Sequence, residues 1–113
     1  MSDDQLDLVF GALADRTRRE ILAALARADA NVADLTAMFT MSQPAVSKHL
    51  KVLEAAGLVS RTRQGTMRLS HLEAEPLRDA TGWLADYRTY WTESYERLDE
   101  LLDSLDRPPI RRT

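Results

Sequence analysis

Apolar residues in the first half of the chain recur every three or four positions. Such spacing places side chains on one face of an α-helix, so the pattern predicts helices over residues 4–13, 16–28, 32–39 and 43–56. The faces expected to turn inward consist of Leu6, Val9, Phe10 and Leu13; of Ile21, Leu22 and Leu25; of Val32, Leu35 and Met38; and of Ala45, Val46, Leu50, Val52, Leu53 and Ala56.

Residues that favour helix ends support these boundaries. Asp15, Asn31 and Ser42 can each accept a hydrogen bond from a free amide of the turn that follows, and Gly57 can end the fourth helix. A tight turn just before Ser42 joins the third helix to the fourth. Two short helices joined in this way make a helix-turn-helix unit, which we expect over about residues 31–56.

The fourth helix carries a polar stripe opposite its apolar one. Pro44 lies in the first turn, where the missing N–H of a proline is harmless. Gln43, Ser47, Lys48 and Lys51 fall on the side that the core does not use. This side is therefore free to contact another molecule.

The pattern changes to alternation after Gly57. Residues 58–72, LVSRTRQGTMRLSHL, alternate with period two on both sides of Gln64 and Gly65, which predicts a β-hairpin. Two strands this short need a helical layer to be stable. Helices followed by such a hairpin, or wing, describe a winged helix-turn-helix, a mainly α fold with a small β-hairpin (α+β).

The last helical segment, about residues 76–105, has the most regular pattern in the chain. Its apolar residues recur at seven-residue intervals in two series, as in the a/d seam of paired helices. A helix of roughly 28 residues would be about 42 Å long, longer than the small domain before it. Part of the seam therefore needs a second copy of the chain, and we expect a homodimer. The two series are Leu77, Leu84, Trp91, Leu98 and Leu105, and Ala80, Tyr87, Ser94 and Leu101.

Composition narrows the class of protein. The 113 residues, 44% of them hydrophobic, suit one small domain spanning residues 1–113. Charges interrupt every apolar run, so neither a membrane span nor a secretory leader is predicted, and a cytoplasmic location is expected. The chain has no cysteine, which excludes disulfides and thiolate metal sites.

The net charge of −3 hides an uneven distribution. Residues 35–72 contain five basic side chains against one acid, Glu54, whereas residues 73–106 contain three basic side chains against ten acids. A polyanion can meet the basic middle without strong repulsion from the acidic end, provided that the two face different ways.

Three stretches resemble the ArsR family of bacterial winged-helix repressors: LADRTRREILAAL, MSQPAVSKHLKVLEAAGLV and the wing RTRQGTMRL. The similarity in layout covers nearly the whole chain. It implies a symmetric dimer formed by the first and last helices, a fourth helix that enters the major groove of DNA, and a wing on the backbone or minor groove. The dimer interface expected on this basis contains Leu6, Phe10, Leu77, Leu84, Tyr87, Trp91, Leu98 and Leu101.

The chain departs from the metal-sensing members of that family. These carry a Cys-Val-Cys box in the third helix, where this chain has Asn31 and Ala33, neither of them a soft ligand. Other members bind zinc through the last helix, which here contains Asp79 but no histidine. We therefore expect no metal, no cofactor and no response to zinc or arsenite, and the effector is unknown.

The polar stripe has residue types suited to DNA. Gln43 can pair with adenine, Lys48 can reach guanine or phosphate, and Ser47 can contact either. His49, near the middle of the apolar side, is open to an internal contact or a DNA contact, and a phosphate partner is open for one of Arg16, Arg18 and Arg19. The expected DNA-binding residues are Ser42, Gln43, Pro44, Ala45, Ser47, Lys48, Lys51, Arg61, Arg63, Gln64 and Arg68.

Two other functions fit the sequence less well. A winged helix that binds protein through the same face, without operator DNA, is the alternative, although the basic middle speaks against it. An enzyme is not expected, because no Ser/His/Asp cluster, phosphate loop or metal-binding pair occurs. The sequence thus predicts a DNA-binding transcriptional regulator that binds palindromic operator DNA as a homodimer and acts as a repressor.

Overall fold

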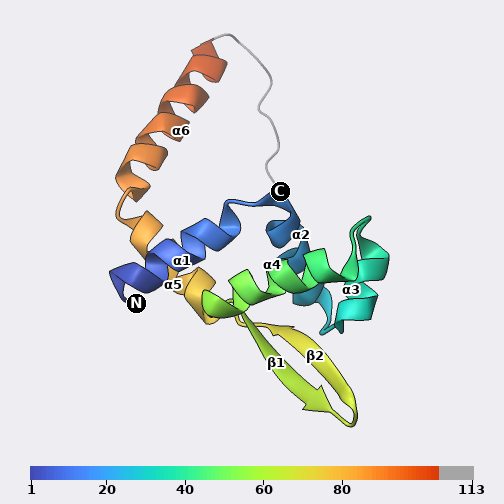
Figure 1. Cartoon of the computed structure of the whole chain (residues 1–113). Helices are drawn as coiled ribbons and strands as arrows, with labels where there is room; N and C mark the ends of the chain where they lie inside the picture. The colour runs from blue at the N-terminus through green and yellow to red at the C-terminus, as the bar shows by residue number, and fades with distance from the viewer. Residues whose placement is uncertain (105–113) are drawn as a thin grey trace. The chain divides into compact units, whose positions relative to one another are not determined.

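The structure, a computed structural model, describes residues 1–104 and divides into two units at Ala80. The expected mainly helical fold with one hairpin is confirmed (Figure 1). The first unit, residues 1–80, holds the helix-turn-helix and the wing. In chain order the elements are α1 (Asp3–Leu13), α2 (Arg16–Arg27), α3 (Val32–Met38), α4 (Gln43–Ala55), β1 (Val59–Gln64), β2 (Met67–Leu72), α5 (Glu75–Ala85) and α6 (Arg88–Ser104).

Side-chain caps fix the start of each of the first four helices. The Asp15 carboxylate accepts from the N–H of Arg18, and the Ser42 hydroxyl oxygen accepts from the N–H of Ala45. Asn31 and Asp34 form a reciprocal capping box at α3, with N–O distances of 2.7 and 3.3 Å. The three caps expected from sequence are confirmed, and Ser2 caps α1 in the same way.

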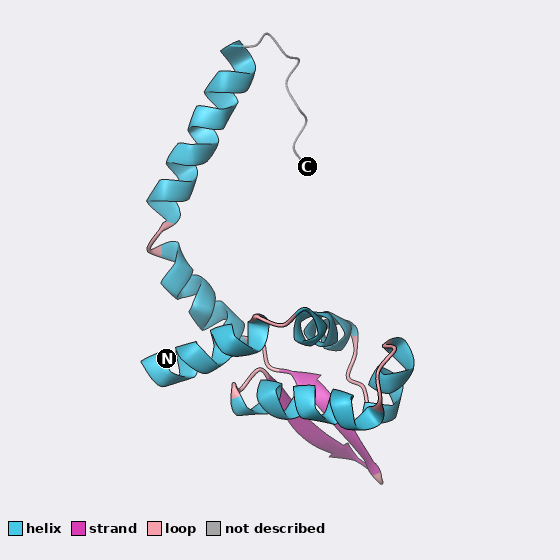
Figure 2. Cartoon of the chain, turned by 45° about the horizontal axis from the view of Figure 1, so that its top comes forward, coloured by secondary structure: helices cyan, strands magenta, loops and turns pink. Residues whose placement is uncertain are grey.

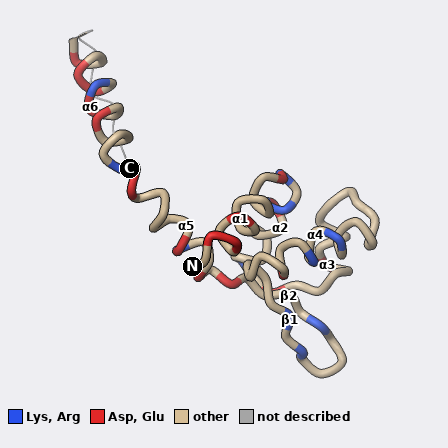
Figure 3. The backbone as a smooth tube through the Cα atoms, turned by 60° about the vertical axis from the view of Figure 1, so that its left-hand side comes forward, with Lys and Arg blue, Asp and Glu red and all other residues tan. Residues whose placement is uncertain are grey.

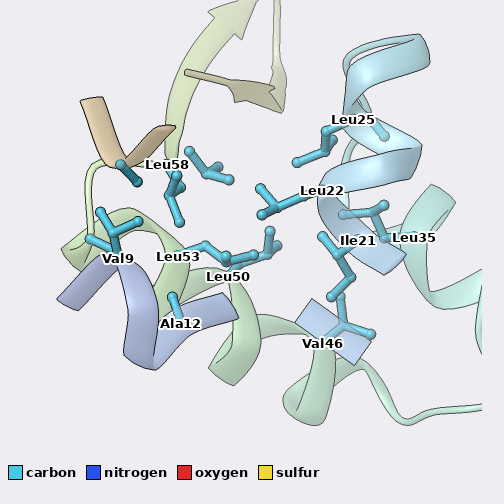
Figure 4. Packing of buried hydrophobic residues seen from close by; sticks show 14 residues of the cluster. Val9, Ala12, Ile21, Leu22, Leu25, Leu35, Val46, Leu50, Leu53 and Leu58 are labelled. Atoms are coloured by element: carbon cyan, nitrogen blue, oxygen red, sulfur yellow. The ribbon is translucent and has the colours of Figure 1, made fainter. Parts of the chain in front are cut away.

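The core lies where α1, α2, α3 and α4 meet the base of the hairpin (Figure 4). Val9, Ile21, Leu35, Leu50 and Leu58 are among its fully buried side chains. Most residues of the expected inward faces belong to this cluster or pack against it. The expected burial of two residues was wrong, because the side chains of Met38 and Val52 are 62% and 38% exposed.

The end of α4 is closed by backbone hydrogen bonds around Gly57. The N–H of Gly57 donates to the carbonyl of Glu54, and the N–H of Leu58 donates to the carbonyl of Leu53. This is the Schellman pattern, in which the residue after the cap adopts a left-handed conformation. Gly57 has a φ of +77°, and the turn sends the buried Leu58 directly from the helix into the core.

The hairpin pairs Val59 with Leu72 at its base and Gln64 with Met67 at its tip. Gly65, with a φ of +65°, begins the two-residue turn between the strands. The backbones of Ser70 and Ala30 exchange two hydrogen bonds of 2.8 and 3.2 Å, which tie β2 to the loop between α2 and α3. Beyond this anchored base the strands extend past the helices of their own unit (Figure 2).

The predicted helix over residues 76–105 is divided into α5 and α6 by a turn at Asp86 and Tyr87. The N–H groups of these two residues bond to carbonyls three positions back, those of Trp83 and Leu84, instead of four. Asp and Tyr are weaker helix formers than Ala or Leu, and no residue of α6 is buried in the described chain to hold the segment straight. Leu105, the last member of the predicted seam, lies outside the described residues.

Replacing Gly57 by alanine tests the closure of α4. A Cβ at this position would lie 3.3 Å from Gln5 Nε2, on a backbone that L residues rarely adopt. We expect Gly57→Ala to lower the free energy of unfolding by about 1–2 kcal/mol, measured by urea denaturation. Gly11→Ala is the control, because a Cβ on this helical glycine meets nothing within 4 Å and should leave stability equal or higher. Equal losses in the two variants would contradict the capping role.

Candidate nucleic-acid interface

The helix α4 has one face in the core and one face in solvent. Val46, Leu50 and Leu53 are each 0% exposed. Gln43 and Lys48 on the opposite side are exposed. Because the apolar stripe fixes the rotation of the helix about its own axis, it also fixes the direction of the polar stripe. In the polar stripe and the helix start, the exposed residues are Ser42, Gln43, Pro44, Lys48 and Lys51, and the half-buried ones are Ala45 and Ser47.

The three arginines of the hairpin share one of its faces. Arg61 and Arg63 are two positions apart on β1 and therefore lie on the same face. Arg63 lies directly opposite Arg68 on β2. Like charges in opposite positions destabilise a strand pair, so the tip of the hairpin gains from a bound anion. Gln64 pairs with Met67 and therefore lies on the other face of the hairpin.

Arg61 differs from the other two arginines because it already has an anionic partner. Its Nε forms an ion pair with the Glu54 carboxylate, across from the last turn of α4. This contact links α4 to the wing within one unit. Arg63 and Arg68 are thus the wing cations that are available to another molecule, whereas Arg61 would have to share its charge.

On α4 and the hairpin basic residues outnumber acidic ones, and the arginines of α2 form a second basic group in this unit (Figure 3). Lys48 and Lys51 lie on α4, and three arginines lie on the hairpin that packs beside it. Glu54, the one acid in this region, is taken up by Arg61. The described α6 carries five acids against two arginines, so most of the acidic end predicted from sequence lies on the other unit.

Arg18 connects α1, α2 and α4. Its guanidinium donates to the carbonyls of Ala12 (2.8 Å) and Gly11 (3.1 Å), and its Nη1 lies 3.4 Å from Nδ1 of His49. The N–H of Arg18 donates to Asp15, and this bond, together with the charge of the guanidinium, holds the pKa of Asp15 below its ordinary value. His49 is therefore engaged in an internal contact, which leaves α4 positioned by a polar contact as well as by its apolar face.

The three arginines at the start of α2 have different environments. Arg18 is held by the contacts above, and Arg19 donates to the carbonyl of Leu13 at 2.6 Å. Both side chains thus satisfy carbonyls at the end of α1. Arg16 is exposed and has no hydrogen bond or ion pair with any described residue, so it is the one of the three that is free for a phosphate. The sequence did not distinguish them, because the difference depends on where α1 ends.

The base of the wing is held by a second polar contact. Nδ1 of His71 lies 2.7 Å from Oδ1 of Asp29, in the loop between α2 and α3. The hydrogen bond and charge of Asp29, with a smaller contribution from Glu73, raise the pKa of His71 above its ordinary value. Glu73 in turn accepts a hydrogen bond from the Ser60 hydroxyl at 2.8 Å. These contacts set the angle at which the hairpin leaves the helices of its unit.

Large apolar side chains are exposed along α5 and α6. Leu84 of the expected interface is half-buried, whereas Tyr87, Trp91, Leu98 and Leu101 are at least 45% exposed. Leu6, Phe10 and Leu77 instead pack partly against the core of their own unit. Leu8, on the outer side of α1 and 50% exposed, was not identified from the sequence. The exposed apolar residues of α5, α6 and the turn between them are Trp83, Tyr87, Tyr90, Trp91, Tyr95, Leu98 and Leu101.

The positions of the family's thiolate ligands have other roles here. Asn31 caps α3, and Ala33 offers no ligand atom. Within residues 1–104, no three His, Asp or Glu side chains are grouped so that they could hold a metal ion. No helix in the described part of the chain is long and apolar enough to cross a membrane.

Comparison with known proteins identifies the class to which this arrangement belongs. Residues 15–61 match the model of the bacterial regulatory proteins of the arsR family. The chain is 40% identical over 101 residues to the HTH-type transcriptional regulator Rv2034 of Mycobacterium tuberculosis, covering 87% of this chain and 89% of that protein. It is 34% identical over 79 residues to the transcriptional repressor SdpR of Bacillus subtilis, covering 70% and 88%.

Solved structures give the same result. A crystal structure of an ArsR family transcriptional regulator is 37% identical, with a TM-score of 0.72 over 81% of this chain and 95% of that one. The homodimeric winged helix-turn-helix DNA-binding domain of Mb0332 from Mycobacterium bovis is 28% identical, with a TM-score of 0.62 over 77% and 89%. The chain is thus a winged helix-turn-helix DNA-binding transcriptional regulator, not an enzyme. It belongs to the ArsR family.

The contact between His71 and Asp29 predicts a measurable titration. A raised pKa means that the ion pair stabilises the folded state fully below about pH 6.5, the ordinary value of histidine, and that this contribution is lost as the pH rises through the pKa of the folded state. An NMR titration of the His71 ring should give a midpoint above 6.5 that falls in Asp29→Asn. An unchanged midpoint in this variant would contradict the pairing.

Proposed function

We propose that this chain is a repressor that binds a palindromic operator as a homodimer, with α4 of each copy in the major groove. The observation that carries the proposal is the exposed polar stripe of α4 next to a hairpin whose arginines share one face. In this proposal residues 31–56 are the helix-turn-helix, residues 58–72 are the wing, and residues 76–105 are the dimerisation segment of a single winged-helix domain spanning residues 1–113.

The start of α4 is suited to reading base edges. Gln43 is at the first helical position and can hydrogen-bond adenine through N6 and N7. Pro44 and Ala45 can contact a thymine methyl. Ser42 and the free amides of the first turn suit a phosphate, since a helix N-terminus favours an anion. Ser47, half-buried, is positioned for phosphate or the edge of a base.

The remaining cations suit the DNA backbone. Lys48 and Lys51 lie in the middle of α4. Arg63 and Arg68 lie near the tip of the hairpin, next to the tight turn at Gly65. Gln64 faces the other side of the hairpin and would meet the groove instead of the phosphates that the arginines contact. Arg61 would contribute in part, because Glu54 shares its charge. We add Arg16, at the start of α2, to the phosphate contacts.

Dimerisation through α1, α5 and α6 is supported by the unburied apolar stripe of the last two helices. A single described chain leaves every residue of α6 unburied, and exposed apolar area of this extent is typical of an interface. The homodimeric state of Mb0332 and the repressor activity of SdpR support the same assembly and direction of regulation. A two-fold dimer reads two half-sites about 10 bp apart. Because bacterial DNA is cytoplasmic, this is where the protein acts.

Two substitutions on α4 separate reading from backbone contact. Lys48→Ala should weaken binding to operator and random DNA alike and lower the salt slope by about one, because one phosphate contact is lost. Gln43→Ala should weaken operator binding by about 1–3 kcal/mol at one base pair per half-site and leave random DNA unchanged. Both are measured by fluorescence anisotropy over a salt series. Arg97→Ala, on α6, is the control. Parallel losses for both variants on both DNAs would refute this division of roles.

The dimer is tested by sedimentation velocity at micromolar concentration. The wild-type protein should sediment at about twice the chain mass of 12.8 kDa, and Trp91→Ala combined with Leu98→Ala should shift the population towards monomer. Thr92→Ala, next to Trp91 and off the seam, is the matched control. If the wild-type protein is a monomer, the proposed homodimer is wrong. If the double variant remains a dimer, the interface does not depend on Trp91 and Leu98.

A further inference from the structure

A groove runs between α2 and α3, on a different part of the unit from the polar stripe of α4. It contains two adjoining cavities of about 420 and 330 Å³ that share Ala24, Arg27 and Met38. Volumes of this size are typical of sites for small molecules. The larger cavity also has the loop that follows α2, residues 28–30, as part of its wall.

Alanines leave space for the groove between the two helices. Ala24 and Ala37 line the larger cavity from the two helices, and Ala23 and Phe39 line the smaller one. Met38, which the helical pattern placed in the core, is 62% exposed at the junction of the two. A methionine side chain is flexible and polarisable, so it adapts to the shape of an apolar ligand.

The charged groups of the larger cavity differ in whether they are engaged. Asp29 is paired with His71, and Asp34 accepts the N–H of Asn31 at the start of α3, where the helix dipole favours a carboxylate. Arg27 lines both cavities and has no hydrogen bond or ion pair with any described residue. Glu20 borders the smaller cavity alone, two helical turns before Arg27 and so about 10 Å away along α2.

We propose that this groove binds a small apolar carboxylate. The guanidinium of Arg27 pairs with the carboxylate, in the two-pronged geometry that arginine favours. The apolar body lies over Ala24, Ala37 and Met38. Neither the family's thiolate positions nor the polar stripe of α4 takes part.

The groove adjoins the joint between the helices and the wing. The loop that closes it carries Asp29, which holds His71, and Ala30, whose backbone holds Ser70. Asp34, on its other wall, belongs to the capping box that starts α3. A ligand in the groove therefore contacts the loop that orients the hairpin and the helix that precedes α4. Occupancy of the groove changes the affinity for operator DNA through these two elements.

The binding test uses three ligands with the same eight-carbon body and different charge: octanoate, 1-octanol and octylammonium. Protein labelled with ¹³C at its methionine methyl groups reports on them, because Met38 lies in the groove and Met67 lies on the hairpin as an internal control. The Met38 signal should shift on titration while that of Met67 moves little. Octanoate should bind at least fivefold more tightly than octanol, and octylammonium most weakly.

Two variants locate the site. Arg27→Gln should reduce the affinity for octanoate to that for octanol, and Arg97→Gln, on α6, should leave it unchanged. Ala37→Leu, an exposed position, should fill the groove and weaken all three ligands with the helical circular dichroism unchanged. Equal or tighter binding of octylammonium would overturn the charge assignment, because it would mean that the carboxylates dominate. Shifts confined to signals outside the groove, or no shift, would overturn the site.

The regulatory part rests on the proposed function and is measured separately. Saturating octanoate should change the operator dissociation constant at least threefold in the wild-type protein and leave it unchanged in Arg27→Gln. Octanoate binding without a change in operator affinity would overturn the regulatory role and retain the site. Absence of operator binding even without ligand would instead reject the proposed function, and the binding result would stand by itself.

Discussion

The burial of a single stripe of α4 is the constraint on which the rest of the structure depends. Val46, Leu50 and Leu53 are completely enclosed, and each such side chain contributes about 1.5–3 kcal/mol relative to an exposed one. Turning the helix half a revolution would expose all three and bury two lysine ammonium groups without partners. The core therefore presents the polar stripe outward in one fixed direction, which is what a reading surface requires.

Polar contacts of α4 and of the hairpin add to the positioning by the core. Arg18 joins the end of α1 to His49 on α4, while Glu54 and Asp29 hold the hairpin through Arg61 and His71. Contacts within the first unit thus hold both α4 and the wing. The loop between α2 and α3 contacts β2 through Asp29 and Ala30 and leads into α3, so the proposed ligand groove lies next to the base of the wing.

The sequence predicted the features that depend on residues close together in the chain. The caps at Asp15, Asn31 and Ser42 and the glycine at the end of α4 follow from residue type and spacing, and so does the polar stripe. Contacts between distant segments were not predictable in this way. The helical periodicity predicted that Met38 is buried. The residues of α2 next to it are alanines, which are too small to cover it, and its side chain is exposed. Periodicity could not tell Arg16 from Arg18 and Arg19, whose partners are carbonyls of α1. The turn at Asp86 interrupts a seven-residue repeat that looked continuous.

Hydroxyl-radical footprinting of the DNA upstream of the protein's own coding sequence tests the central claim most directly. Two copies of α4 held in successive major grooves should protect two short patches centred about one helical turn, roughly 10 bp, apart on the same side of the duplex. Protection should be lost when the polar stripe is altered at Gln43 and Lys48 together. A single patch, or protection that survives this double change, would show that α4 does not read DNA as proposed.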